Sequence, residues 1–144
     1  MNHDSKTPLY SIGTAARMLG ISVHTMRLYE RSGFIVPYKR ETNQRLYSDS
    51  DIERLRCMRN AINVEKISIE GIRHVLALIP CWAIVSCSEA DRTSCAAYNS
   101  HTEPCWAMKK KGAFCAHRDC RSCEVYAAYG DCRSIKEKLK ELLN

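Results

Sequence analysis

Apolar residues recur at helical spacing through the first half of the chain. In residues 10–20 four of them stand at positions i, i+3, i+4 and i+7, namely Ile12, Ala15, Ala16 and Leu19. This pattern indicates one apolar face of a short helix. Gly20 interrupts that helix, Ser22 can cap a second one, and Gly33 can end it. Two short helices joined by a tight turn predict a helix-turn-helix.

Residues 34–47 predict a β-hairpin. The segments 34–36 and 45–47 are strand-like, and the polar stretch between them is typical of a turn. Such a hairpin beside a helix-turn-helix would be a wing, and its cations would suit DNA phosphates. These cations are Lys39, Arg40 and Arg45.

Two more helices follow in the pattern. The third could be capped by Asp49 or Asp51, and it would bury Ile52, Leu55, Met58 and Ile62. We expect the opposite face of this helix to be solvated, with Arg54, Arg56 and Arg59 on it. The fourth helix would begin after Ser68 and end before Pro80.

The motifs of this half resemble those of one family. They are Y-S-I-G-x-A-A-x-x-L-G-I-S-x-x-T-x-R-x-Y-E-x-x-G-F, then a proline, then N-x-R-x-Y-S-x-x-D-I-x-x-L. Together they are similar to the MerR family of winged-helix transcription regulators, over residues 9–79. The resemblance implies a homodimer that binds a palindrome in double-stranded promoter DNA. It further implies that the regulator bends and untwists the promoter, and so acts on RNA polymerase indirectly.

The resemblance also implies a set of DNA-contacting residues. Arg27, on the second helix, could fork onto a guanine edge or a phosphate. Tyr29 and Tyr47 could hold the DNA backbone or could equally pack between helix and wing. The full set is Thr14, Arg17, His24, Thr25, Arg27, Tyr29, Lys39, Arg40, Arg45 and Tyr47.

Composition changes abruptly after residue 80. Of nine cysteines, eight follow that point: Cys81, Cys87, Cys95, Cys105, Cys115, Cys120, Cys123 and Cys132. The chain starts without the apolar run of an export signal, which favours a cytoplasmic protein with reduced thiols. We therefore interpret all eight as metal ligands rather than disulfides. They could divide into two four-cysteine sites, although the spacing leaves the pairing open.

An internal repeat organises these cysteines. Residues 80–83, P-C-W-A, recur at 104–107, and C-x-x-Y occurs at both 95–98 and 123–126. The segment is similar to duplicated Cys-Trp modules, called two-CW domains. It replaces the long dimerisation helix usual in the MerR family, which leaves the dimer interface open. The cofactor could be an iron–sulfur cluster or zinc, and a metal-free thiol switch is a third possibility.

The sequence thus predicts a mainly α protein in three parts. They are a winged helix-turn-helix DNA-binding domain with four helices and a hairpin wing (9–79), a metal-stapled cysteine-rich module (80–132) and a short amphipathic helix (133–144). The net charge of +6 is compatible with DNA. No apolar run is long enough to cross a membrane, and no catalytic motif indicates an enzyme.

The hypothesis is a dimeric regulator that senses metal or redox state through its cysteines. One alternative keeps DNA binding but makes the cysteine module purely structural, with zinc. The other is a cysteine-cluster protein for electron transfer or metal delivery.

Overall fold

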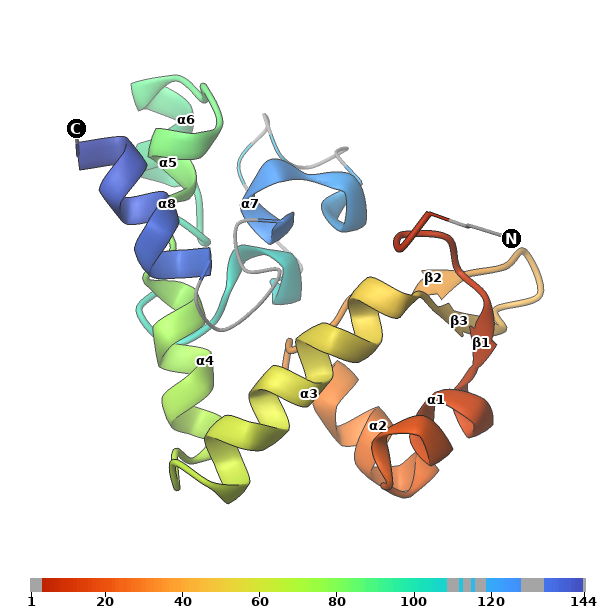
Figure 1. Ribbon diagram of the computed structural model, residues 1–144. Helices are drawn as coiled ribbons and strands as arrows, with labels where there is room; N and C mark the ends of the chain where they lie inside the picture. The colour runs from red at the N-terminus through yellow and green to blue at the C-terminus, as the bar shows by residue number, and fades with distance from the viewer. Residues whose placement is uncertain (1–3, 109–111, 113–114, 116–118, 128–133, 144) are drawn as a thin grey trace.

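A long diagonal helix connects two parts of the molecule (Figure 1). The computed structural model describes residues 4–108, 112, 115, 119–127 and 134–143. We call residues 4–79 the N-terminal domain and the described residues from 80 to 127 the cysteine-rich segment. Helix α3 (Asp49–Asn63) crosses the N-terminal domain, and α4 (Ile69–Ala77) turns away from its end toward the cysteine-rich segment.

Side-chain caps define the first two helices. Helix α1 (Ile12–Leu19) starts after Ser11, whose hydroxyl accepts a hydrogen bond from the backbone of Thr14. It ends at Gly20, where φ is 68°, a left-handed value that suits glycine. Helix α2 (Val23–Arg31) starts after Ser22, whose hydroxyl accepts from the backbone of Thr25. The predicted helix-turn-helix is confirmed.

The sheet has three short antiparallel strands in the order β1–β3–β2. They are β1 (Tyr10–Ser11), β2 (Tyr38–Lys39) and β3 (Arg45–Tyr47). The third strand was predicted, but the partner strand expected at 34–36 is wrong. Phe34 and Ile35 lie in a loop with almost no exposed surface, because they fill the core. A short apolar run does not by itself distinguish a strand from a buried loop.

Serine caps also begin the third and fourth helices. The N-cap of α3 is Ser48, not Asp49 or Asp51 as the sequence suggested. The Asp51 carboxylate instead accepts from the Ser48 backbone and completes a capping box. Helix α4 begins after Ser68, as predicted. The core beneath them is apolar, with Met26, Ile52, Leu55, Met58, Ile72 and Leu76 almost fully buried.

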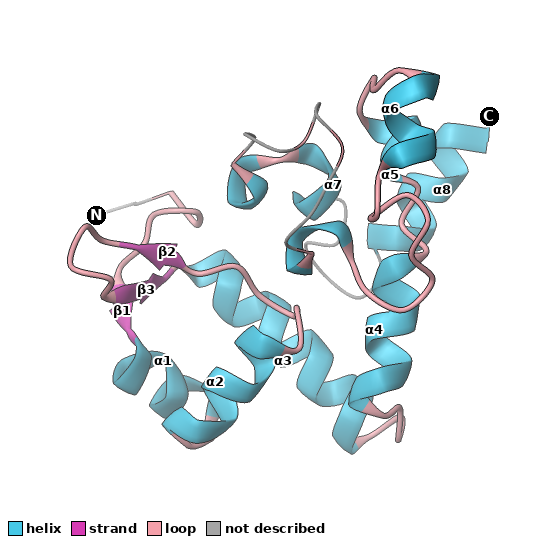
Figure 2. Ribbon diagram, turned by 180° about the vertical axis from the view of Figure 1, so that it is seen from behind, coloured by secondary structure: helices cyan, strands magenta, loops and turns pink. Residues whose placement is uncertain are grey.

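Short helices joined by loops make up the rest of the described chain (Figure 2). The cysteine-rich segment contains α5 (Cys81–Ile84), α6 (Glu89–Ser94), the 3-10 turns η1 (Cys105–Ala107) and η2 (Cys120–Ser122), and α7 (Glu124–Ala127). Helix α8 (Ser134–Leu143) comes last. Within the described residues, no helix combines the length and the apolar character needed to span a membrane.

Candidate DNA interface and thiol pocket

Helix α2 presents polar side chains to solvent and apolar ones to the core. His24 and Arg27 are exposed, whereas Met26 and Tyr29 are buried on the opposite side. Within the described chain, no hydrogen bond or ion pair holds the Arg27 side chain. A guanidinium in this position is available to a guanine edge or a phosphate.

Thr14, Arg17 and Thr25 lie around the caps of the first two helices. The Thr14 hydroxyl accepts hydrogen bonds from the Ser11 hydroxyl and from Arg17, at 3.1 and 3.3 Å. The Thr25 hydroxyl lies 3.0 Å from that of Ser22. These contacts fix the side chains near the helix N-termini, where backbone N–H groups favour an anion.

The wing carries two of its three cations in the open. Lys39 and Arg40 are exposed, and Arg40 contacts the side chain of Gln44 across the turn. Asn43 takes a left-handed φ of 65° there. Asparagine tolerates this conformation better than most residues. Asn43 therefore suits the tight turn between the two strands of the wing.

Arg45, the third wing cation, is paired inside the domain. Its Nε donates to both carboxylate oxygens of Glu30 on α2, at 2.6 and 2.8 Å. The hydrogen bond to Glu30 raises the pKa of Arg45 further above its ordinary value. Glu30 has no local signal in the sequence that would assign it to this pair. The pair ties the wing to the second helix and offsets the charge of Arg45.

Tyr29 and Tyr47 belong to the core. Tyr47 has no exposed surface, and among the described residues its hydroxyl has no hydrogen-bond partner. The hydroxyl of Tyr29 accepts from Arg59 at 3.0 Å. The sequence left open whether these tyrosines hold the DNA backbone or pack between helix and wing. In the structure both rings pack in the core.

The cysteine-rich segment encloses a cavity that we call the thiol pocket. All seven described cysteines among the eight predicted ligands line it: Cys81, Cys87, Cys95, Cys105, Cys115, Cys120 and Cys123. Cys132 lies outside the described residues. Cys57, on α3, is disulfide-bonded, so the expectation that the thiols are all reduced is wrong for this residue. The other walls include Val85, Trp106, Val125 and Tyr126, and the enclosed volume is about 30 Å³. The structure therefore gathers both halves of the repeat around one space.

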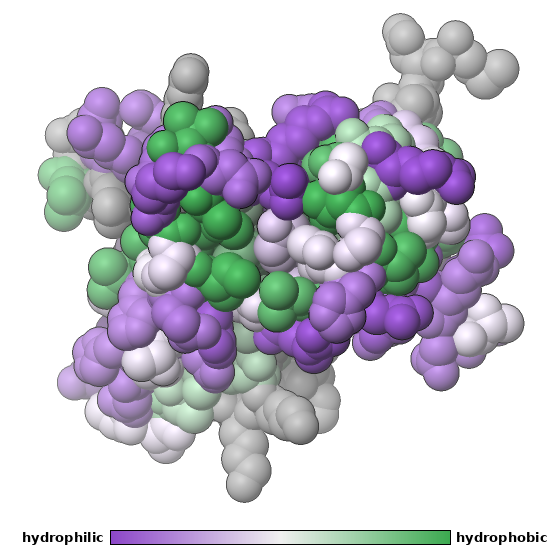
Figure 3. Space-filling model, turned by 90° about the horizontal axis from the view of Figure 1, so that it is seen from below, coloured by the Kyte–Doolittle hydropathy of each residue, from purple (hydrophilic) through white to green (hydrophobic). Residues whose placement is uncertain are grey.

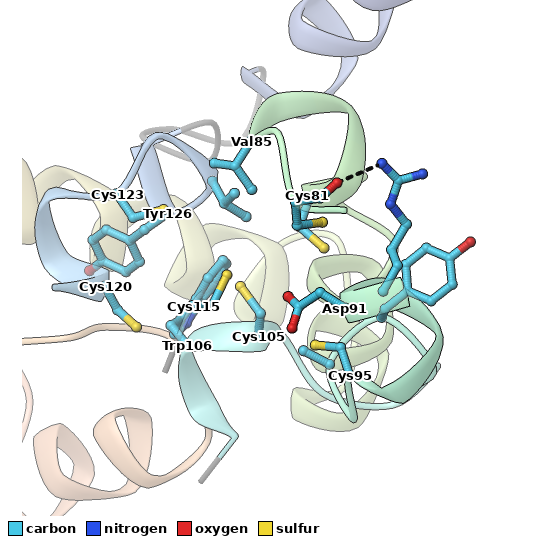
Figure 4. Close-up of a pocket in the computed structure, with 15 residues that line it drawn as sticks. Cys81, Val85, Asp91, Cys95, Cys105, Trp106, Cys115, Cys120, Cys123 and Tyr126 are labelled. Carbon is cyan, nitrogen blue, oxygen red and sulfur yellow. Dashed lines mark hydrogen bonds between the residues drawn. The ribbon is translucent and has the colours of Figure 1, made fainter. Parts of the chain in front are cut away.

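The thiols are not all equivalent within this pocket. Figure 4 shows Cys81, Cys105 and Cys115 around the centre, with Cys120 and Cys123 toward Tyr126. Burial raises the pKa of Cys81 to about 11, and the nearby thiols of Cys95, Cys87 and Cys115 contribute to the rise. Cys81 is therefore a neutral thiol at pH 7. The thiol of Cys115 lies near enough to Cys81 to influence it electrostatically.

The thiols are close but are not arranged as a coordination site. Among the described residues, no group of three or more histidine, cysteine, aspartate or glutamate side chains is positioned to hold a metal ion. The chemistry of the pocket nevertheless suits a soft cation, because thiolates are its preferred ligands. The buried Gly112 N–H donates to the sulfur of Cys95 at 3.2 Å, an interaction that also stabilises a thiolate.

The thiol pocket shares a wall with the end of helix α2. Trp106 lines the pocket, and its indole N–H donates to the carbonyl of Gly33 at 2.6 Å. Gly33 has a φ of +81°, and a Cβ there would lie 3.0 Å from the Cβ of Ala107. Glycine thus serves both as the predicted helix stop and as the seat for the second P-C-W-A unit.

A buried arginine stands beneath this contact. Arg54 has 3% of its surface exposed, and it donates to the carbonyls of Phe34 and Tyr126, at 2.9 Å each. Its guanidinium carbon lies 3.8 Å from the ring centroid of Tyr126 and 5.3 Å from that of Trp106. The expectation of a solvated Arg54 is wrong, because the cysteine-rich segment covers that face of α3. Arg56 is exposed, as expected, and Arg59 is partly buried beside Tyr29.

The two tryptophans of the repeat differ. Trp106 is packed edge-on against Tyr126, with ring centroids 5.2 Å apart. Trp82 makes a similar contact with Tyr98 but leaves 40% of its surface exposed. The repeat in sequence therefore yields one buried and one exposed indole.

The fold and the exposed cations define a class of protein. A helix-turn-helix followed by a short β-hairpin with exposed lysine and arginine is the architecture of a winged-helix DNA-binding domain. The match of residues 10–79 to the model "MerR HTH family regulatory protein" agrees with that class. Residues 10–79 therefore match a MerR-family helix-turn-helix domain in both sequence and fold.

Curated relatives match the same half of the chain. The HspR heat shock protein of Streptomyces coelicolor is 36% identical over 72 residues, which are 50% of this chain and 48% of that protein. Heavy metal-dependent transcription regulator 2 of Rhizobium meliloti is 39% identical, over 47% of this chain and 46% of its own. ZntR of Escherichia coli K12 is 35% identical, over 49% and 50%. The chain thus spans about half the length of the curated relatives it matches. MerR-family relatives such as these are transcription regulators, not enzymes.

Proposed function

We propose that the protein is a homodimeric regulator that binds double-stranded promoter DNA and changes its conformation in response to metal or redox state at the thiol pocket. One observation carries this proposal. Trp106 is at once a wall of the thiol pocket and a hydrogen-bond donor to the end of helix α2. The Trp106 side chain therefore connects the pocket directly to the end of the helix that we expect in the major groove.

The proposed DNA contacts follow from exposure. His24 and Arg27 on α2 reach base edges or phosphates, and Arg17, Lys39 and Arg40 reach phosphates on either side. Thr14 and Thr25 contribute through the capped helix N-termini, and Arg45 contributes as the Glu30-paired cation. Tyr29 and Tyr47 support these contacts from the core rather than touching DNA.

Pocket size favours a single thiophilic ion over a cluster. A space of about 30 Å³ takes a guest of roughly atomic size. A multi-atom iron–sulfur cluster would need the walls to move apart. Zinc is therefore the preferred resident or signal, and oxidation of neighbouring thiols is the second way to change the same pocket. The printed names of two relatives, a heavy metal-dependent regulator and ZntR, are in keeping with a metal signal.

Apolar surface supports the homodimer. Val64, Val75, Leu78 and Trp82, at the end of α3 and along α4 and α5, leave between 40% and 70% of their surface exposed. Figure 3 shows apolar patches among hydrophilic side chains on the face that includes the turn between α3 and α4. Surface of this kind marks protein contacts. It occupies the place where the family's long dimerisation helix would begin.

Arginine substitutions test the DNA interface. The Arg27→Ala variant should weaken binding to a duplex selected from a random-sequence pool by about 1–3 kcal/mol if the contact is direct. Arg56→Ala is the matched control, because Arg56 is exposed on α3 and paired with Glu53. It should change affinity by less than about 0.5 kcal/mol. Equal affinity of Arg27→Ala and wild type would refute the interface and favour the electron-transfer alternative.

Chelation separates sensing from a purely structural metal. Protein purified without oxygen is analysed for bound metal and by absorption spectroscopy, then titrated with a chelator. A sensor keeps its far-ultraviolet circular dichroism after metal removal and changes its affinity for the selected duplex. Unfolding on chelation, with no separate change in DNA binding, would instead establish the structural alternative.

A further inference from the structure

Arg121 connects the thiol pocket to the base of the wing. It lies in η2, directly after Cys120 and two residues before Cys123, both of which line the pocket. Its guanidinium reaches the N-terminal domain. Nη1 donates to the carbonyl of Val36 at 2.6 Å, and Nη2 donates to the Asp51 carboxylate at 2.9 Å.

The groups that receive these bonds control the wing. Val36 stands two residues before strand β2, and its own backbone N–H donates to the hydroxyl of Tyr126. Asp51 completes the capping box with Ser48, which directly follows strand β3. Arg121 therefore contacts the chain at both ends of the hairpin. Its ion pair with Asp51 is mostly buried, with 17% of the Arg121 side chain and 6% of the Asp51 side chain exposed.

A short turn separates the two thiols from the contacts of Arg121. The turn is three residues long, and it is closed by a hydrogen bond from the Cys123 backbone to the Cys120 carbonyl. A metal ion held by both sulfurs, each about 2.3 Å from it, would fix the positions of Cys120 and Cys123 on either side of Arg121. A groove of about 800 Å³, lined by Asp51, Arg121 and Tyr126 among others, lies beside the pair. It gives the guanidinium room to leave.

We propose that Arg121 is the positioning residue that transmits the state of Cys120 and Cys123 to the wing, an inference that rests on the proposed sensing function. With the thiols unligated, Arg121 holds Val36 and Asp51 together and fixes the wing against α3. Ligation or oxidation of the two cysteines withdraws the guanidinium, and the wing changes its pose on the phosphates. The capping box of α3 survives, because Ser48 and Asp51 bond to each other directly.

The test compares the response to cadmium in wild type and Arg121→Gln. Affinity for the selected duplex is measured by fluorescence anisotropy on full-length protein, with and without Cd²⁺. Cd²⁺ binding itself is followed by metal–thiolate absorption. Wild-type affinity should change by about 5- to 150-fold, the range of ordinary coupling between sites. Arg121→Gln should bind Cd²⁺ equally well and hold DNA with nearly the same affinity in both states.

Three further variants separate coupling from mere stability. Asp51→Asn keeps an oxygen for the capping box but removes the ion pair, so it should lose the response as Arg121→Gln does. Arg121→Lys restores a charge without the fork and should recover part of the response. Arg73→Gln is the control. It breaks the ion pair with Glu103, which also ties the cysteine-rich segment down but lies on α4, away from the wing, and it should respond like wild type.

Each result decides the matter. A wild-type response that Arg121→Gln and Asp51→Asn retain in full would overturn the role of Arg121 while leaving the sensing function intact. A response lost equally in Arg73→Gln would also overturn it, because any loosened contact would then suffice. If wild type binds Cd²⁺ without any change in DNA affinity, the proposed function fails and this inference fails with it.

Discussion

The N-terminal domain and the cysteine-rich segment are held together in different ways. The domain is stabilised by a continuous apolar core, in which Phe34, Leu55 and Met58 have no exposed surface. The segment has few buried apolar side chains and only short helices. It is anchored to the domain by a few apolar side chains that join the domain's core, namely Val85, Trp106, Val125 and Tyr126, and by polar contacts such as those of Trp106 with Gly33 and of Arg121 with Asp51. A firm core suits a part that keeps its shape, whereas a few directional bonds suit the shift that the proposed function requires of the segment.

Shortening a side chain in the apolar core should cause the largest loss of stability. Leu55→Ala removes a fully buried side chain at the centre of α3, and we expect it to cost about 2–5 kcal/mol of unfolding free energy. Chemical denaturation followed by circular dichroism measures this. Leu143→Ala is the control, since Leu143 is 83% exposed, and it should stay within about 0.5 kcal/mol. Comparable effects of the two variants would break the comparison.

Removing one anchor should have an intermediate effect. Trp106→Phe keeps an aromatic ring in the thiol pocket but deletes the donor to the Gly33 carbonyl. A buried acceptor left without its partner costs about 1–3 kcal/mol. Relative to wild type, amide hydrogen exchange in this variant should become faster in the cysteine-rich segment and change less in α3. Trp82→Phe should leave both regions unchanged, and a Trp106→Phe variant that behaved the same way would mean that polar anchoring is not what holds the segment.

Altering the buried hydroxyl of Tyr47 should have the smallest effect at neutral pH. Burial raises the pKa of Tyr47 to about 12, with a further contribution from Glu30. The unfolded chain ionises near pH 10, so the folded state loses stability as pH rises from about 10 to 12. Tyr47→Phe should match wild type at pH 7, since the hydroxyl has no partner among the described residues. It should lose less stability at alkaline pH.

Thermal unfolding at pH 7 and at pH values above 10 checks this sign. Tyr38→Phe serves as the exposed control, with 44% of its surface accessible, and should follow wild type throughout. A large loss of stability in Tyr47→Phe at pH 7 would show that the hydroxyl has a bonding role in the core.

The same division separates what the sequence predicted from what it did not. Helices α1, α2 and α4 were predictable because their caps, Ser22 and Ser68 among them, and their apolar spacing are local signals. Residues 34–36 were misjudged as a strand because burial of an irregular segment leaves the same apolar run. Arg54 was misjudged because its partner Tyr126 lies 72 positions away. Cysteine counts indicated a thiol-rich site, but the contacts of Trp106 with Gly33 and of Arg121 with Val36 are long-range and have no local signature.

Promoter geometry measured by energy transfer tests the central claim most directly. A selected duplex labelled at both ends is bound by full-length protein, first with the thiols reduced and metal-free and then with Cd²⁺ added. We expect the end-to-end transfer efficiency to change on Cd²⁺ binding while the protein stays bound, because the thiol pocket repositions the wing and α2. Unchanged transfer efficiency and unchanged affinity, with Cd²⁺ demonstrably on the thiols, would contradict the account.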